Sequence, residues 1–279
     1  MLCINYTKHK KSNQNAADWL LGDPMNEDQT ETIELESFRS RSSSRIIAVG
    51  AILSAVYAIT VLLPMSQFIG AGSGSILSFA ICIAPLFGLV LGPRYGFAFG
   101  GIAAILATIV SIQFGSLYLL VPTIILGPAI SGLLTGLCLR PITDFQGIKV
   151  PGPIITAMYL FLVVLLYLLP LYEAWWFILP YVLAAVVAII LQLSRFRFDS
   201  AASFSRIPLQ ILPLTLIGSF ADFSMMTLGS VYILGLDAFV FGSLIFPVML
   251  IERTVSVIIS AIIAGVLFTA FRNELFVEA

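Results

Sequence analysis

The sequence predicts an all-α protein, a polytopic bundle of about eight transmembrane helices with both termini on the cytoplasmic side. Of its 279 residues 59% are hydrophobic and only 10% are charged, and the mean hydropathy is +1.04. Soluble domains contain roughly 25% charged residues. A chain so poor in charge is suited to lipid, and we expect it to lie in the cell membrane.

The first 45 residues differ from the rest of the chain. They are polar, contain an acidic stretch from Glu27 to Glu36, and end in a run of Arg and Ser up to Arg45. A segment of this composition does not bury enough apolar surface to fold alone. We therefore expect residues 1–45 to be a disordered cytoplasmic tail and residues 46–279 to form the transmembrane helical domain.

Apolar runs follow one another along the transmembrane domain, and most have the ~17–25 residues that a helix needs to cross ~30 Å of hydrocarbon. The last run is longer than one span requires and is expected to divide at Pro247 or at Glu252–Arg253. The segment 153–194 is expected to form an added helical hairpin. The expected spans are 46–64, 76–92, 95–113, 117–139, 153–171, 176–194, 209–235 and 239–271.

The basic residues test this arrangement independently. With the N-terminus inside, the inside loops carry seven of the eight Lys and Arg residues that follow residue 45, namely Arg94, Arg140, Lys149, Arg195, Arg197, Arg206 and Arg272. The outside loops carry none, as the positive-inside rule requires. Arg253 is the one exception. Trp175 and Trp176 fall at an expected outer boundary, where aromatic side chains collect.

Several classes of function are disfavoured by what the sequence lacks. His9 is the only histidine, and the three cysteines are scattered with no CxxC pair, so neither a metal site nor a His-dependent enzyme is expected. There is no GxxxxGK[ST] phosphate loop, no HExxH and no GxSxG motif. The net charge of −1 gives no support for nucleic-acid binding. We expect a protein without catalytic residues and without a cofactor.

Three charged residues inside the predicted spans are candidates for a binding site. Asp222 falls near the middle of the seventh span, and Glu252–Arg253 is the only adjacent pair of opposite charges in the apolar region. A charge in the bilayer core costs several kcal/mol unless it is paired, protonated or in contact with water. Arg253 is expected to pair with Asp222 or to hold an anionic ligand group. A purely structural ion pair or hydrogen bond would explain the same residues equally well.

Two further features concern contacts between helices. Ala51 and Ala55 lie four residues apart in the first span, and small residues at that spacing let two helices approach closely in lipid. Ordinary packing within the chain would also explain them. In the segment Gly92-Pro93-Arg94, Gly92 can end one helix and Pro93 can begin the next. Arg94 is then expected at the cytoplasmic surface, as an anchor or as a contact point for a partner.

Three stretches carry a resemblance to a known family. They are IAVGAILSA at 47–55, LVLGPRYGF at 89–97, and the pair formed by GSFAD at 218–222 and FPVMLIER at 246–253. In these stretches the chain resembles the substrate-binding membrane subunit, the S component, of energy-coupling-factor (ECF) transporters, in particular the archaeal-type members. The N-terminal tail and the hairpin at 153–194 are departures from the usual pattern of that family.

The resemblance implies a non-enzymatic subunit that binds a small, vitamin-like molecule from outside. A separate transmembrane coupling protein and ABC-type ATPases would then drive its uptake. The resemblance also implies that Ala51 and Ala55 contact the coupling protein. The substrate-binding residues that it implies are Asp222, Glu252 and Arg253, with Gln113, Tyr118 and Trp176 as weaker candidates.

Two other classes of function stay open at this point. A self-sufficient secondary transporter would use Asp222 as its proton or sodium site, with unwound helices near the membrane midplane. A membrane-embedded enzyme acting on lipid is less compatible with a sequence that has a single histidine and no cluster of acids.

Overall fold

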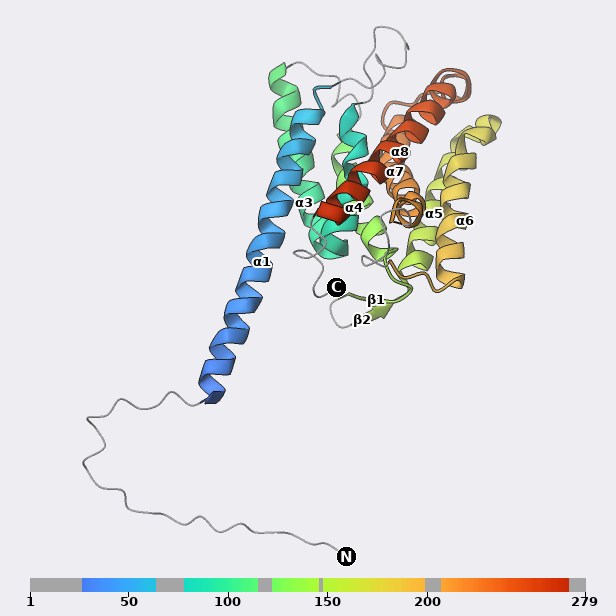
Figure 1. The fold of residues 1–279 in the computed structure, drawn as a ribbon. Coiled ribbons are helices and arrows are strands. Elements are labelled where there is room, and N and C mark those ends of the chain that lie inside the picture. The colour runs from blue at the N-terminus through green and yellow to red at the C-terminus, as the bar shows by residue number, and fades with distance from the viewer. Residues whose placement is uncertain (1–26, 64–77, 115–121, 146–147, 199–206, 271–279) are drawn as a thin grey trace, which may run out of the picture. The chain divides into compact units, whose positions relative to one another are not determined.

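The computed structural model describes residues 27–63, 78–114, 122–145, 148–198 and 207–270, and the described chain is almost entirely helical (Figure 1). Helix α1 spans Glu27–Thr60 and so begins inside the segment expected to be a disordered tail. Residues 1–26 of that tail lie outside the described part. The chain divides into two compact units between Ser43 and Ser44, and every side chain discussed below belongs to the second unit.

The remaining elements follow in a simple order. After α1 come the 3₁₀ helix η2 (Phe79–Cys82), α3 (Ala84–Phe114), the 3₁₀ helix η4 (Pro122–Leu126) and α4 (Gly127–Leu137). An antiparallel ribbon of β1 (Thr143–Phe145) and β2 (Ile148–Val150) leads to α5 (Gly152–Leu171), the 3₁₀ segment η5 (Tyr172–Ile178) and α6 (Leu179–Leu193). The last described elements are α7 (Ile207–Tyr232), the π-helical segment η6 (Val240–Ile245) and α8 (Phe246–Ala270).

Four helical segments in the described part of the chain are long and apolar enough to cross a membrane, which corrects the expected number of eight. They are Ala84–Phe114, Gly152–Leu193, Ile207–Tyr232 and Val240–Phe268. The second and third expected spans fall within α3, whose two helical segments meet at the non-helical residue Gly92, and the fifth and sixth fall within Gly152–Leu193, which is interrupted at Ala174 in η5. The first and fourth correspond to the shorter apolar helices Ser44–Thr60 and Pro122–Leu137.

The outward-facing side chains of these helices are themselves apolar. Ile112 in α3, Leu169 in α5 and Leu193 in α6 are exposed by 67%, 68% and 77% of their surface. A soluble protein rarely leaves continuous apolar surface of this kind in water, whereas lipid is a favourable environment for it. The surface and the four apolar helices together indicate an all-α protein of the membrane.

Gly92 lies where two helical segments of α3 meet, so the break expected between Gly92 and Pro93 is present. Its φ of 75° and ψ of −178° belong to a backbone region that is essentially open only to glycine. Gly92 ends the first segment with a conformation that combines positive φ with extended ψ. Near the C-terminus, the change from η6 to α8 falls at Phe246, beside Pro247, and α8 continues through Glu252–Arg253.

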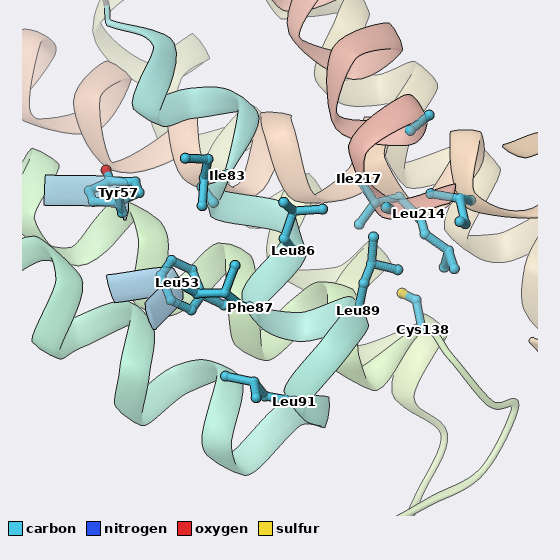
Figure 2. Packing of buried hydrophobic residues seen from close by; sticks show 14 of the residues in the cluster. Leu53, Tyr57, Ile83, Leu86, Phe87, Leu89, Leu91, Cys138, Leu214 and Ile217 are labelled. Atoms are coloured by element: carbon cyan, nitrogen blue, oxygen red, sulfur yellow. The ribbon is translucent and has the colours of Figure 1, made fainter. Parts of the chain in front are cut away.

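Apolar side chains join α1 to the first segment of α3 (Figure 2). Leu53 and Tyr57 of α1 belong to the same buried cluster as Phe87, and the ring centroids of Tyr57 and Phe87 are 6.0 Å apart. The cluster extends past Leu89 to Leu214 on α7. This packing fixes which face of α1 is turned inward.

Glycine residues let α3 and α4 pack with their backbones in contact. A Cβ atom added to Gly100 in α3 would lie 2.5 Å from the carbonyl oxygen of Pro128 in α4. A Cβ atom added to Gly136 in α4 would lie 2.6 Å from the Cα atom of Pro93. Close backbone approach through small residues is the usual way in which helices associate in lipid. On another side, α4 packs against α7.

Candidate functional site

Helix α7 is the central element of the candidate site, and side-chain hydroxyl groups tie it to its neighbours. The Ser131 hydroxyl in α4 donates to the Gly218 carbonyl oxygen at 2.8 Å, and the Thr123 hydroxyl in η4 donates to the Met225 carbonyl oxygen at 2.6 Å. The Thr215 hydroxyl of α7 donates to a carbonyl oxygen of α8 at 3.3 Å. These bonds hold the α7 backbone in place on both sides of Asp222.

Asp222 and Arg253 form a buried ion pair between α7 and α8. The Nη1 atom of Arg253 lies 3.2 Å from Oδ2 of Asp222 and donates to the carbonyl oxygen of Ser219 at 3.0 Å. Arg253 is 1% exposed and Asp222 is 5% exposed. The sequence offered Asp222 as one of two partners for Arg253, and this pairing is the one present.

Two further residues complete the surroundings of the ion pair. The Cζ atom of Arg253 lies 4.4 Å from the centroid of the Phe223 ring, which is a cation–π arrangement. Gly127, the first residue of α4, borders the carboxylate, because a Cβ atom added there would lie 2.6 Å from Oδ1 of Asp222. The negative charge therefore lies at the N-terminal end of α4, where the helix dipole stabilises it.

Glu252 is enclosed in the protein without a visible partner. It is 0% exposed, and neither of its carboxylate oxygens has a hydrogen-bond partner among the described residues. The Nε atom of Arg253 and the hydroxyl of Ser219 are also buried without a hydrogen-bond partner in this part of the chain. With the Ser256 hydroxyl, five such atoms lie on the packed helices α7 and α8. Protein interiors pair almost all of their polar groups, so this concentration is typical of a site that takes water, an ion or a ligand.

The polar side of α8 continues below Glu252. Ser256 and Ser260 follow at intervals of four residues, and both are buried. The Ser260 hydroxyl donates to the Cys82 carbonyl oxygen at 2.6 Å, and the Ser256 hydroxyl lies beside the Cys82 thiol. The end of η2 is thereby held against the face of α8 that carries Glu252.

The weaker predicted binding residues differ from this buried group. Trp176 in η5 is 37% exposed, and its Nε1 atom donates to the Gly242 carbonyl oxygen in η6 at 3.3 Å. Gln113 is exposed, one residue before the end of α3. Tyr118 lies outside the described residues, as does the loop 64–77 that the resemblance places near the substrate.

Three residues of the site were not among the sequence candidates. Ser219 and Phe223 lie one turn before Asp222 and directly after it, and their position beside an intramembrane acid was a usable signal. Gly127 is distant in sequence, and nothing in its surroundings marks it as a neighbour of Asp222.

The residues predicted to contact a partner are all on the surface. Ala51 and Ala55 are exposed, whereas Leu53 and Tyr57 on the same helix are buried in the core. The two alanines are therefore not used for packing within the described part of the chain. Arg94 is exposed directly after the break at Gly92–Pro93.

Comparison of the chain with models of known protein families, with curated proteins and with solved structures found no match. Within the described residues, there is no group of three or more His, Cys, Asp and Glu side chains that could hold a metal ion. The site thus has to be interpreted from its own chemistry.

Proposed function

We propose that the chain is the substrate-binding membrane subunit of an ATP-driven, ECF-type uptake transporter for a small, vitamin-like molecule. The observation that carries this proposal is the group formed by Asp222, Arg253 and Glu252 within the helical bundle. Charged groups at this depth are expensive and are usually retained for function. A chain that needed only stability would fill the space between α7 and α8 with apolar side chains.

The unsatisfied atoms of the group favour binding over a purely structural role. A structural ion pair satisfies its donors and acceptors, because each unpaired buried polar atom costs about 1–3 kcal/mol. Here Arg253 uses Nη1 on Asp222 and Ser219, while its Nε atom and both oxygens of Glu252 have no partner among the described residues. A polar ligand would supply the missing partners.

The outward position of Ala51 and Ala55 supports the need for a partner protein. Two small residues one turn apart form a shallow strip on which another helix can pack closely. The alternative for this strip was packing within the chain, and both residues are exposed instead. We assign the strip to a transmembrane coupling protein that works with ABC-type ATPases, since the sequence itself has no phosphate loop.

The distribution of basic residues supports the orientation that this function needs. Arg94, Arg140, Arg195 and Arg197 are all exposed and belong to loops expected on one side. By the positive-inside rule that side is the cytoplasm. In the proposed complex in the cell membrane, both termini are cytoplasmic, and Arg94 can contact the partner there.

The secondary-transporter alternative, with Asp222 as the ion site, is less favourable. A carboxylate that couples transport to protons or sodium must bind and release that ion during each cycle. Asp222 instead holds the fixed positive charge of Arg253 at 3.2 Å. An arginine side chain cannot give up its proton in a protein, so Asp222 is already neutralised without an ion.

Affinity purification of the full chain in mild detergent, followed by mass spectrometry, tests the proposal. We expect a transmembrane coupling protein and ABC-type ATPases to co-purify. Ala51→Trp and Ala55→Trp should remove these partners and abolish uptake, because a large side chain prevents close helix packing. Leu162→Trp is the matched control, since Leu162 is 51% exposed on α5 and lies away from the strip in sequence.

Two results would contradict the proposal. One is recovery of the chain alone under conditions that preserve known membrane complexes. The other is uptake that follows an ion gradient in liposomes containing only this chain, which would support the secondary transporter.

A further inference from the structure

We infer that the site around Glu252 binds the positively charged nitrogen of an organic ammonium or amidinium substrate, with Glu252 as its counter-charge. The inference rests on the proposed function and names the class of substrate that the same site takes. The charges between α7 and α8, the unsatisfied hydrogen-bonding atoms and the neighbouring apolar side chains support it.

The buried charges of the site do not cancel. Asp222 and Arg253 neutralise each other at 3.2 Å, and the helix end at Gly127 further stabilises the Asp222 carboxylate. Glu252 is left over as a second acid with 0% exposure. A buried carboxylate without a positive partner is strongly unfavourable, so the site is complete only when a cation or a proton joins Glu252.

No side chain of the protein is available to fill that role in the described structure. Among the basic residues whose burial is described, Arg253 is the only buried one, and it is already bound to Asp222. The other basic residues whose side chains are described are all exposed, namely Arg45, Arg94, Arg140, Lys149, Arg195 and Arg197.

The sequence extends this argument to segments that the structure does not describe. Residues 64–77 and 115–121 contain no Lys, Arg or His. The remaining basic residues are those of the N-terminal tail together with Arg206 and Arg272, which all belong to the expected cytoplasmic side. Apart from a proton, the positive partner that Glu252 lacks would therefore be supplied by a ligand.

Hydrogen bonding also favours a cationic nitrogen. An ammonium or amidinium group carries several N–H donors and no acceptor, and Glu252 offers two carboxylate oxygens without partners in the described chain. The unpaired Nε–H of Arg253 could donate to an anionic substrate, but such a substrate would also meet the Glu252 charge, and two acids beside one arginine give the site an excess of negative charge.

An apolar cluster, closed in the described structure, adjoins the turn of α8 that precedes Glu252. Met249, one turn before Glu252, is fully buried in a cluster that contains Phe177, Phe223 and Phe241. The Phe177 and Phe241 ring centroids are 5.0 Å apart in an edge-to-face arrangement. Aromatic and aliphatic surface beside one charged group is the usual composition of a small-molecule site.

Thermal unfolding of the full chain in mild detergent tests the inference with three matched probes. Benzylammonium is the cation, benzyl alcohol the neutral compound and benzoate the anion. We expect benzylammonium alone to raise Tm, by about 2–4 °C near saturation. Glu252→Gln should abolish the shift, and Glu252→Asp should retain part of it. Glu173→Gln is the control, because Glu173 is exposed in η5 and its loss should leave the shift unchanged.

Each other result would overturn the inference. Stabilisation by benzoate would assign the site to anions, and equal shifts with benzyl alcohol would show that charge is not recognised. No shift with any probe, or a shift that survives in Glu252→Gln, would exclude Glu252 as the counter-charge. Stabilisation by sodium chloride over potassium chloride, lost in Glu252→Gln, would assign the site to an inorganic ion.

The probe experiment and the co-purification experiment fail independently. Binding of benzylammonium by a chain that purifies without coupling protein or ATPases would retain the cation site and reject the transporter-subunit function. Recovery of those partners without any benzylammonium effect would retain the function and reject the substrate class.

Discussion

The α3–α4 pair packs through backbone contacts at glycine residues, whereas the α7–α8 pair packs around charged side chains. Between α3 and α4, glycines such as Gly100 and Gly136 bring the backbones into contact and leave no room for a side chain. Between α7 and α8, the contact includes an ion pair, a cation–π contact and a carboxylate without a described partner. The first interface is closed by direct backbone contact, whereas the second contains charged atoms that have no hydrogen-bond partner in the described chain.

This difference assigns stability mainly to the α3–α4 interface and the proposed binding role to the α7–α8 interface. Close packing of small residues gains dispersion contacts and loses little side-chain entropy, so it stabilises helices even in lipid. Buried charges between α7 and α8 add little net stability, since desolvation offsets most of their attraction. We therefore expect substitutions in the two regions to differ in size, with a gain in stability only where an unpaired charge is removed or a glycine faces open space.

The largest effect is expected from breaking the ion pair. Arg253→Met leaves Asp222 buried without a positive partner and should lower the free energy of unfolding by about 3–5 kcal/mol. Thermal unfolding in mild detergent measures it. Arg197→Met is the control, because Arg197 is exposed and its loss should change stability by less than about 0.5 kcal/mol.

A double variant tests whether the stability lost in Arg253→Met comes from the unpaired Asp222 charge or from lost packing. Asp222→Leu combined with Arg253→Met removes both charges, and we expect it to recover most of the stability lost in Arg253→Met. If the double variant were as unstable as the sum of the single ones, the two residues would act separately, and the comparison between the interfaces would be wrong.

A smaller loss is expected in the glycine interface, where two neighbouring residues form a matched pair. Gly100→Ala would place its Cβ atom 2.5 Å from the Pro128 carbonyl oxygen, so the backbones must separate, at a cost of about 1–3 kcal/mol. Gly101→Ala meets nothing within 4 Å and should gain up to about 1 kcal/mol from helix propensity. Equal stabilities of the two variants would show that α3 and α4 do not pack as described.

The smallest expected effect is an increase in stability. Glu252→Gln removes an unpaired buried carboxylate, and we expect Tm of the ligand-free protein to rise by about 2–4 °C. Glu173→Gln at the exposed surface should leave Tm unchanged. A clear fall in Tm for Glu252→Gln would mean that Glu252 has a structural partner, and the contrast between the two interfaces would then not hold.

The apolar character of the protein and the candidates for its site were predictable from local chemistry. An intramembrane Asp, Glu or Arg is conspicuous in a sequence with 10% charged residues, and the break at Gly92–Pro93 follows from the backbone preferences of those two residues. The number of long apolar helices was overestimated, because two expected spans are shorter helices and the other six fall within four helical segments, one of which contains the break at Gly92.

By itself the sequence determined that this is a helical protein of the membrane, since composition and the length of apolar runs act along the chain without regard to its fold. Only the tertiary structure decided which charges meet. It brought Arg253 of α8 to 3.2 Å from Asp222 of α7, because these two helices pack side by side. It placed Gly127 beside Asp222 and turned Ala51 and Ala55 outward, because packing between distant segments sets the orientation of each helix.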